Sequence, residues 1–178
     1  CLGTLPEEFV AQREDLFKDR LAVEMKKYLG TDFKRIGHAA KVANYAEKIA
    51  KKERGNLPVI LCAAYLYDIG AKNAVEKYES DKPEYVEKEN PAIARELMEK
   101  LGAKEELVEE VVGIVSHRSR PDDAADLSQK VLHDADTLTY MSSCDDKNGV
   151  DEEEFKTKLD RIFLTAAGNA LAKQVLLN

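Results

Sequence analysis

Hydrophobic residues recur at helical spacing along most of this chain, and no stretch alternates between apolar and polar positions as a β-strand does. The pattern predicts helices over residues 7–30, 32–55, 57–69, 91–102, 104–117 and 127–141. Asp151 and Glu154 resemble a capping box that opens a further helix, with Phe155, Leu159, Ile162 and Ala166 on its core face. The chain is therefore expected to be an all-α helical bundle.

One strongly charged stretch, residues 71–90, separates the predicted helices in the middle of the chain. It is expected to be either a solvated connector or a mobile cover over a functional site. Asn90 and Pro91 would then serve as the N-cap and first residue of the helix that follows it.

Every residue from Leu57 to Ile69 is apolar except Pro58 and Asp68. A carboxylate at the end of so apolar a helix is costly to bury unless a cation or a strong hydrogen-bond donor meets it. Its position near the negative end of the helix dipole adds to this cost. A bound metal ion is the simplest partner for Asp68.

Two of the chain's three histidines lie on the inward faces of other predicted helices. His38 shares a face with Val42 and Ile49, and His117 continues the face of Ile114. Asp136 belongs to yet another helix. A hydrolytic metal site needs ligands that converge from separate elements and leave positions open for water and substrate, which this arrangement allows.

Composition narrows the choice of function. A length of 178 residues is typical of one domain, and a net charge of −7 disfavours binding to nucleic acids or anionic membranes. A small phosphorylated molecule is still compatible with a local cationic site. The three cysteines form neither a disulfide set nor a metal motif, which favours the cytoplasm. The apolar run at residues 57–69 is too short to cross a bilayer.

The order and spacing of four motifs resemble the HD-domain superfamily of metal-dependent phosphohydrolases. The motifs are Arg35-Ile36-Gly37-His38, Tyr67-Asp68-Ile69-Gly70, Ile114-Val115-Ser116-His117 and Asp134-Ala135-Asp136-Thr137-Leu138. The resemblance covers about residues 30–142. With C-terminal helices over residues 150–178, it implies a single HD-like domain over residues 1–178.

The resemblance implies a role for each matching residue. His38, Asp68 and Asp136 would bind a divalent ion, with Mn, Fe, Co, Ni, Zn and Mg as the candidates. His117 would hold a second ion or contact a phosphate group. Lys72 lies four residues after Asp68, and Arg118 and Arg120 follow His117, so their charges and positions make them further candidates. Asp68, His117 and Lys72 form the expected catalytic set, and Arg118 and Arg120 would bind the substrate phosphate. The expected substrate is a nucleotide or another small phosphate ester.

Tyr67 is the main departure from the family pattern, since a histidine precedes the aspartate in the HD motif. A phenol rarely binds divalent ions, and its ordinary pKa is about 10. His133, three residues before Asp136, is a candidate replacement ligand. A rival interpretation therefore stands beside hydrolysis: a degenerate HD module that binds a ligand or partner protein without turnover.

Overall fold

Helices make up all of the regular secondary structure in the described part of this computed structural model. That part comprises residues 7–144 and 151–178, with side chains described from residue 16 onward. The helices are α1 (Glu7–Leu29), α2 (Phe33–Glu53), α3 (Leu57–Leu66), α4 (Ala71–Tyr78), α5 (Pro83–Lys100), α6 (Glu105–Val115), α7 (Leu127–Ser143), α8 (Glu152–Ile162) and α9 (Ala166–Leu177). The all-α prediction is confirmed. The predicted boundaries at residues 1 and 150 lie outside the described residues.

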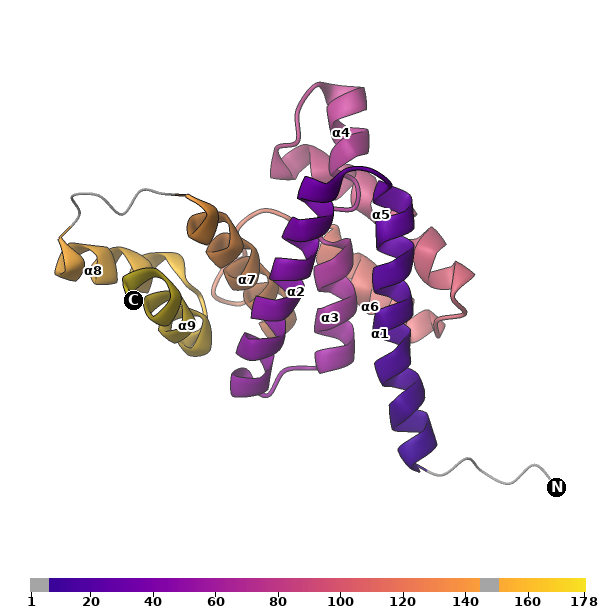
Figure 1. The fold of residues 1–178 in the computed structure, drawn as a ribbon, viewed down its shortest axis with the longest axis horizontal. Helices are drawn as coiled ribbons and strands as arrows, with labels where there is room; N and C mark the ends of the chain where they lie inside the picture. Colours follow the sequence, from indigo (N-terminus) through magenta and orange to yellow (C-terminus); the bar gives the residue numbers. More distant parts are fainter. Residues whose placement is uncertain (1–6, 145–150) are drawn as a thin grey trace.

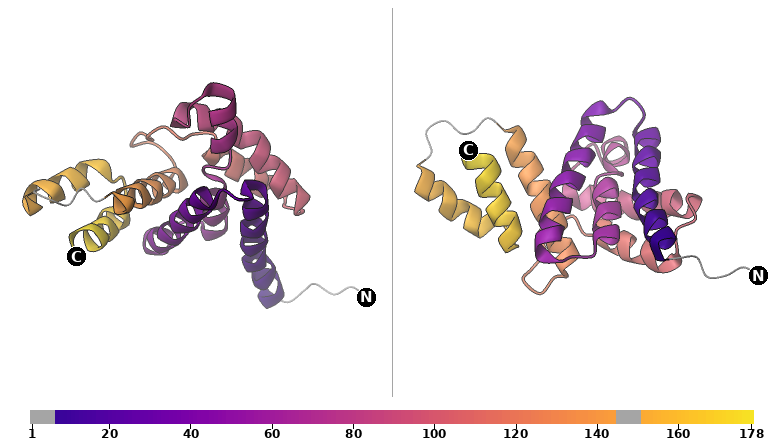
Figure 2. Two further views of the ribbon diagram at one scale, coloured as in Figure 1. Left: turned by 45° about the horizontal axis from the view of Figure 1, so that its top comes forward. Right: turned by 60° about the horizontal axis from the view of Figure 1, so that its bottom comes forward.

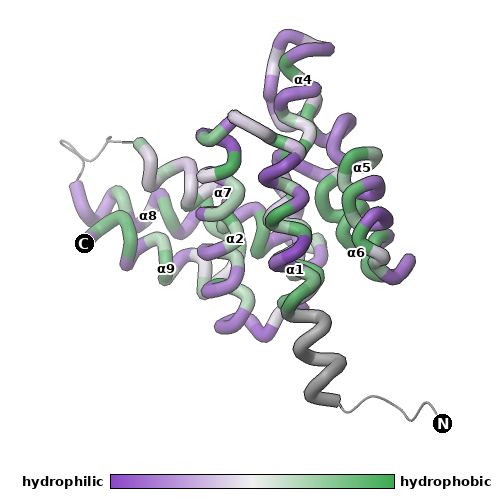
Figure 3. The backbone as a smooth tube through the Cα atoms, turned by 45° about the vertical axis from the view of Figure 1, so that its right-hand side comes forward, coloured by the Kyte–Doolittle hydropathy of each residue, from purple (hydrophilic) through white to green (hydrophobic). Residues whose placement is uncertain are grey.

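Helix α3 is the centre of the main core. It packs against α1, α2, α6 and α7, and it lies between α1 and α2 in Figures 1 and 2. Ile60, Ala63 and Leu66 are fully buried, which explains why this helix is apolar on every side. The surrounding helices are amphipathic, and hydrophobic and hydrophilic positions alternate along them in Figure 3. None of the described helices has an apolar stretch long enough to cross a bilayer.

The boundaries of the first helices follow their capping signals. Gly30 adopts a positive φ of 63° after α1, as expected for a helix C-terminus. The side chain of Asp32 accepts a hydrogen bond from the amide of Arg35 and so caps α2. Helix α3 stops at Leu66, which leaves residues 67–70 in a turn.

The charged stretch of residues 71–90, expected to be a solvated connector or a mobile cover, is largely helical. These residues form α4 and the first half of α5, a helical hairpin that lies at the top of Figure 1. A small cluster holds the hairpin together: Val86 packs on alanines of α4, and the rings of Tyr78 and Tyr85 stack with centroids 4.9 Å apart. The charged residues between these anchors hid the apolar positions that make the segment helical.

Asn90 and Pro91 do not start a helix, contrary to the prediction. Helix α5 begins at Pro83, whose fixed φ suits the first turn, and Pro91 lies inside it. The chain offers two prolines that could each begin a helix, and local sequence does not distinguish them. Packing of Val86 against α4 makes the earlier start favourable.

The C-terminal segment contains two helices, whereas the sequence predicted a single helix with a core face from Phe155 to Ala166. Helix α8 ends at Ile162, and Ala166 is the first residue of α9. Thr165 ends the break, because its side chain accepts a hydrogen bond from the Gly168 amide and caps α9. Asp151 occupies the N-cap position of α8, but its side chain makes no capping hydrogen bond.

Asp134 fastens this break to α7. It is fully buried and accepts hydrogen bonds from the amides of Leu164 and Thr165 at 2.9 and 2.8 Å. The Thr165 hydroxyl donates a third at 2.7 Å. Burial raises the pKa of Asp134, and these donors oppose the rise. A side chain at Gly168 would collide with the same carboxylate, so the start of α9 can approach it only as glycine.

Asp134→Asn is expected to destabilise the protein by about 2 to 3 kcal/mol. The amide has one acceptor oxygen in place of two, so at least one buried donor loses its partner. The free energy of unfolding from urea titrations measures the effect. Asp123→Asn removes the charge of an exposed loop aspartate and should leave the unfolding midpoint unchanged. Equal midpoints for both variants would contradict this role of Asp134.

Candidate metal centre

A tight turn after α3 carries Asp68 to the site. The amide of Ile69 bonds the carbonyl of Leu66, and the amide of Ala71 bonds the carbonyl of Asp68, so the chain reverses directly into α4. A Cβ atom on Gly70 would lie 2.8 Å from Cβ of Glu89 and 2.9 Å from the Asn90 nitrogen. Only glycine lets the turn approach α5 this closely, which accounts for the glycine in the motif.

Asn90 holds this turn and the end of α6 in place. It is fully buried in α5 and accepts a hydrogen bond from the Gly70 amide at 2.8 Å. Its own amide group donates to the carbonyl of Tyr67 at 2.7 Å and to that of Val115 at 2.9 Å. One side chain therefore fixes the segments that carry Asp68 and residues 116–118. Local sequence gave no sign of this, because Asn before Pro also fits a helix cap.

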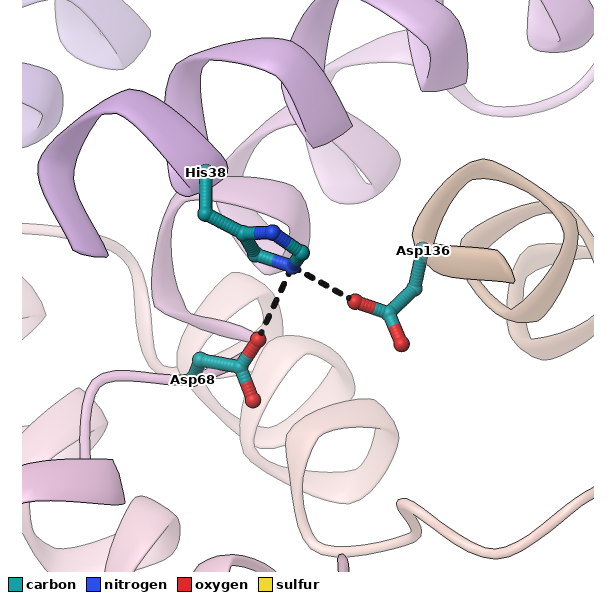
Figure 4. A group of neighbouring side chains, drawn as sticks. All are labelled: His38, Asp68 and Asp136. Carbon is teal, nitrogen blue, oxygen red and sulfur yellow. Dashed lines mark hydrogen bonds and ion pairs between the residues drawn. The ribbon is translucent and has the colours of Figure 1, made fainter. Parts of the chain in front are cut away.

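Three predicted ligands converge, as Figure 4 shows. The Nε2 atom of His38 lies 2.9 Å from Oδ1 of Asp136 and 3.4 Å from Oδ2 of Asp68. His38 comes from α2, Asp136 from α7 and Asp68 from the turn after α3. Each of the three side chains is partly buried.

The donor set fits a divalent ion. One donor atom from each of the three residues lies within 4.8 Å of the others. Ligand atoms bonded at about 2.1 Å and at right angles to one another lie about 3.0 Å apart. The contacts of 2.9 and 3.4 Å from His38 bracket this value. One imidazole with two carboxylates can therefore hold an ion and leave other positions open.

Arg118 approaches the same two carboxylates from the other side. Its guanidinium lies 2.7 Å from Oδ1 of Asp68 and 3.4 Å from Oδ2 of Asp136. These are the oxygens that do not face His38. The side chain of Arg118 is only 8% exposed, although it belongs to the loop between α6 and α7. The prediction that Arg118 belongs to the site agrees with its position, but its visible partners are the ligand carboxylates.

Tyr67 supports Arg118. The phenol ring is buried, and Cζ of Arg118 lies 3.9 Å from the ring centroid, a cation–π contact. Burial raises the pKa of Tyr67 to about 12, against the opposing charge of Arg118. The residue is therefore a neutral phenol at physiological pH. Where the HD motif has a histidine, this chain therefore has a tyrosine whose ring packs against Arg118.

Mutual charge compensation sets the ionisation of the cluster. Burial by itself would raise the pKa of Asp68, but Arg118 and His38 outweigh it and hold that pKa below its ordinary range. Burial would likewise lower the pKa of Arg118, and the two carboxylates raise it. Hydrogen bonds to Asp136 and Asp68 raise the pKa of His38 from 6.5 to about 9. Two cations thus face two carboxylates when no other ion is bound.

The remaining predicted site residues lie outside this group. His117 is exposed, and its Nδ1 atom lies 2.8 Å from the carbonyl oxygen of Gly113. Lys72 is exposed on the first turn of α4, and Arg120 donates to the carbonyl of Arg161 at 3.3 Å. His133 is half-buried on α7, where burial lowers its pKa. Their roles in binding stay predictions, with His133 outside the three-residue donor group.

Glu87 is a further residue of the site that sequence reasoning missed. Its carboxylate accepts a hydrogen bond from the Arg118 amide at 2.9 Å and lies 3.5 Å from the Ser119 hydroxyl. It therefore holds the loop backbone beside the site from α5. Nothing in the sequence marked it, since it is one of several charged residues in the segment 71–90.

Comparison with known proteins agrees with the fold and the motif order. The model of the HD domain matches residues 35–141, more than half of the sequence, so the chain belongs to the HD-domain family. A crystal structure described as a predicted HD superfamily hydrolase from an uncultured Thermotogales bacterium superposes with a TM-score of 0.60. The two chains are 22% identical over 87% of this chain and 82% of the other. This likeness shows the fold. No curated protein sequence matches the chain.

Stability of the metal-free protein is expected to fall as pH rises from 6.5 to about 9. The folded state holds the His38 proton more tightly than the unfolded state, so the charged imidazole stabilises below 6.5 and loses its effect above the raised pKa. Solvent screening reduces the loss to about 1 to 2 kcal/mol. Urea titrations across this range measure it. His38→Gln should give a flatter profile, and the same slope in both proteins would contradict the assignment.

Proposed function

We propose that this protein is a metal-dependent phosphohydrolase that acts on a nucleotide or another small phosphate ester. The observation that carries the proposal is the convergence of His38, Asp68 and Asp136, whose donor atoms lie within 4.8 Å of one another. Membership of the HD-domain family supports the same chemistry. Imidazole and carboxylate donors suit Mn, Fe, Co, Ni, Zn or Mg.

Each residue of the cluster has a distinct part in this proposal. His38 Nε2, Asp68 Oδ2 and Asp136 Oδ1 would hold the ion. Arg118 contacts the far oxygens of both carboxylates when no ion is bound. A bound divalent ion lowers the pKa of water and polarises a phosphoryl oxygen. We also propose Lys72 and Arg120 as exposed cations for the substrate phosphate. His117 would contact phosphate or a second ion after its side chain turns away from Gly113.

The substrate class follows from charge. The protein carries a net charge of −7, which repels polyanions such as nucleic acids. A small ester needs only the local cations near the site. We propose a cytoplasmic metabolite as the substrate, in keeping with free cysteines at positions 62 and 144.

Hydrolysis should depend on the metal and on the three donors. We expect wild-type protein to hydrolyse at least one nucleoside monophosphate or an aryl phosphate when Mn²⁺, Co²⁺ or Mg²⁺ is added. Asp68→Asn and His38→Gln should each reduce the rate at least about 100-fold, because loss of a direct ligand exceeds the effect of removing a group behind it. Asp123→Asn should keep the wild-type rate. Wild-type protein that is inactive with every substrate and metal would refute the proposal.

A second candidate function is a binding module without turnover. Tyr67 favours it because it stands where the HD motif has a metal-binding histidine, and it contacts Arg118. Arg118 favours it because it supplies positive charge to the carboxylates. Such a module would bind a phosphorylated ligand or a partner protein. Metal analysis after purification without chelator separates the two candidates, because the module has no need of an ion.

Tyr67→His is expected to tighten Mn²⁺ binding by more than about tenfold, because it adds an imidazole beside the donors, and direct ligands contribute at least this much. The smaller ring leaves a void that costs about 1 kcal/mol of stability. Calorimetric titration measures the affinity. Tyr67→Phe keeps the ring without adding a donor and should bind Mn²⁺ as the wild type does. If Tyr67→His binds no better than Tyr67→Phe, residue 67 does not occupy a ligand position.

A further inference from the structure

Arg118 is the one described residue that contacts both carboxylates of the donor group from the side opposite His38. It lies against Asp68 Oδ1 at 2.7 Å and Asp136 Oδ2 at 3.4 Å. A charged guanidinium has a rigid planar fork that suits two acceptors at once. These contacts give the two carboxylates a cationic partner without any metal ion. A residue of the chain itself, Arg118, therefore balances the negative charge of Asp68.

A divalent ion at the same carboxylates would sit close to this guanidinium. Each carboxylate joins one oxygen to Arg118 and offers the other to the ion, so the two positive centres would be only about 6 Å apart. At that separation, in a partly buried site, repulsion between charges of +2 and +1 exceeds what is needed for a tenfold change in affinity. We propose that Arg118 competes with a divalent metal ion for Asp68 and Asp136. This inference rests on the proposed metal site.

Tyr67 holds the competing arginine in position. Cζ of Arg118 lies 3.9 Å from the ring centroid, and the backbone of residue 67 is held by the hydrogen bond that its carbonyl accepts from Asn90. A histidine at this position would offer a donor to the ion and a smaller, less electron-rich face to the guanidinium. The tyrosine and the arginine therefore act in the same direction, and both disfavour a bound ion.

The side chain of Arg118 can move away from the two carboxylates while the backbone of the site stays in place. It belongs to the loop that follows α6, and Glu87 holds its backbone amide independently of the side chain. Its Nε atom is buried without a hydrogen-bond partner, so the inward conformer is less stable than a fully paired one. An ion that outcompetes Arg118 would release the side chain to the solvent-exposed loop region, where it can meet an anionic ligand.

Mn²⁺ titration monitored by electron paramagnetic resonance tests the competition directly. Arg118→Gln should bind Mn²⁺ at least tenfold more tightly than the wild type, because it removes the nearby positive charge. Arg118→Lys keeps the charge but loses the planar fork and the stack on Tyr67, so its affinity should lie between the two. Arg95→Gln is the matched control. It removes a guanidinium whose ion pairs among the described residues are with Glu99, Glu105 and Glu109, and should bind Mn²⁺ as the wild type does.

Loss of Arg118 leaves His38 as the one described cationic partner of Asp68 and Asp136, so the metal-free Arg118→Gln protein will be less stable. If it is unfolded, Mn²⁺ should restore its helical circular dichroism spectrum. The proposal is wrong if Mn²⁺ restores nothing and Arg118→Lys binds no tighter than the wild type. It is also wrong if both variants bind Mn²⁺ more weakly, since Arg118 would then be positioning the ligands.

These outcomes are separate from those of the proposed function. Tighter Mn²⁺ binding by Arg118→Gln without phosphate ester hydrolysis in any protein would support the competition and refute the phosphohydrolase. Metal-dependent hydrolysis by the wild type, with unchanged Mn²⁺ affinity in both Arg118 variants, would support the phosphohydrolase and refute the competition.

Discussion

The charge of Asp68 is the constraint on which this structure depends. An apolar helix delivers the carboxylate to the end of the main core, where an unpaired charge would be strongly destabilising. The protein meets this cost with Arg118 and His38 on opposite sides of the carboxylate. Both cations also reach Asp136, so α2, α7, the α3–α4 turn and the loop after α6 are joined by one set of charges.

A second layer of polar side chains makes this pairing geometrically possible. Asn90 and Glu87 both come from α5 and bond to backbone atoms at the two segments that carry Asp68 and Arg118. Residues 71–90, a charged stretch in the sequence, therefore contain the two side chains that set the distance between Asp68 and Arg118.

The helical fold was predictable from the periodic pattern of apolar positions, which also places His38 on an inward helix face. Asp68 is conspicuous among apolar neighbours, and the choice of His38, Asp68 and Asp136 as ligands followed from the resemblance of their motifs to the HD pattern. The contacts of Arg118 with Asp68 and Asp136 were beyond such reasoning, since a loop residue has no periodic face and its direction depends on tertiary contacts. The same holds for Asn90, whose local pattern fits a cap. Asp134 was passed over as part of the motif, although its partners 30 residues later define where α9 begins.

The C-terminal helices share a smaller hydrophobic cluster of their own, although α9 also packs on α2, and we expect this arrangement to give the molecule two levels of cooperativity. Leu138, Leu159, Phe163, Ala172 and Leu176 form a hydrophobic cluster distinct from the main core. A cluster of this size protects backbone amides from hydrogen exchange less than a full core does. Helices α8 and α9 should therefore exchange their amides through partial opening events, while α3 exchanges only when the whole domain unfolds. Helix α7, which carries Asp136, contributes residues to both clusters. Partial opening of α8 and α9 should therefore remove the packing contacts from one side of α7.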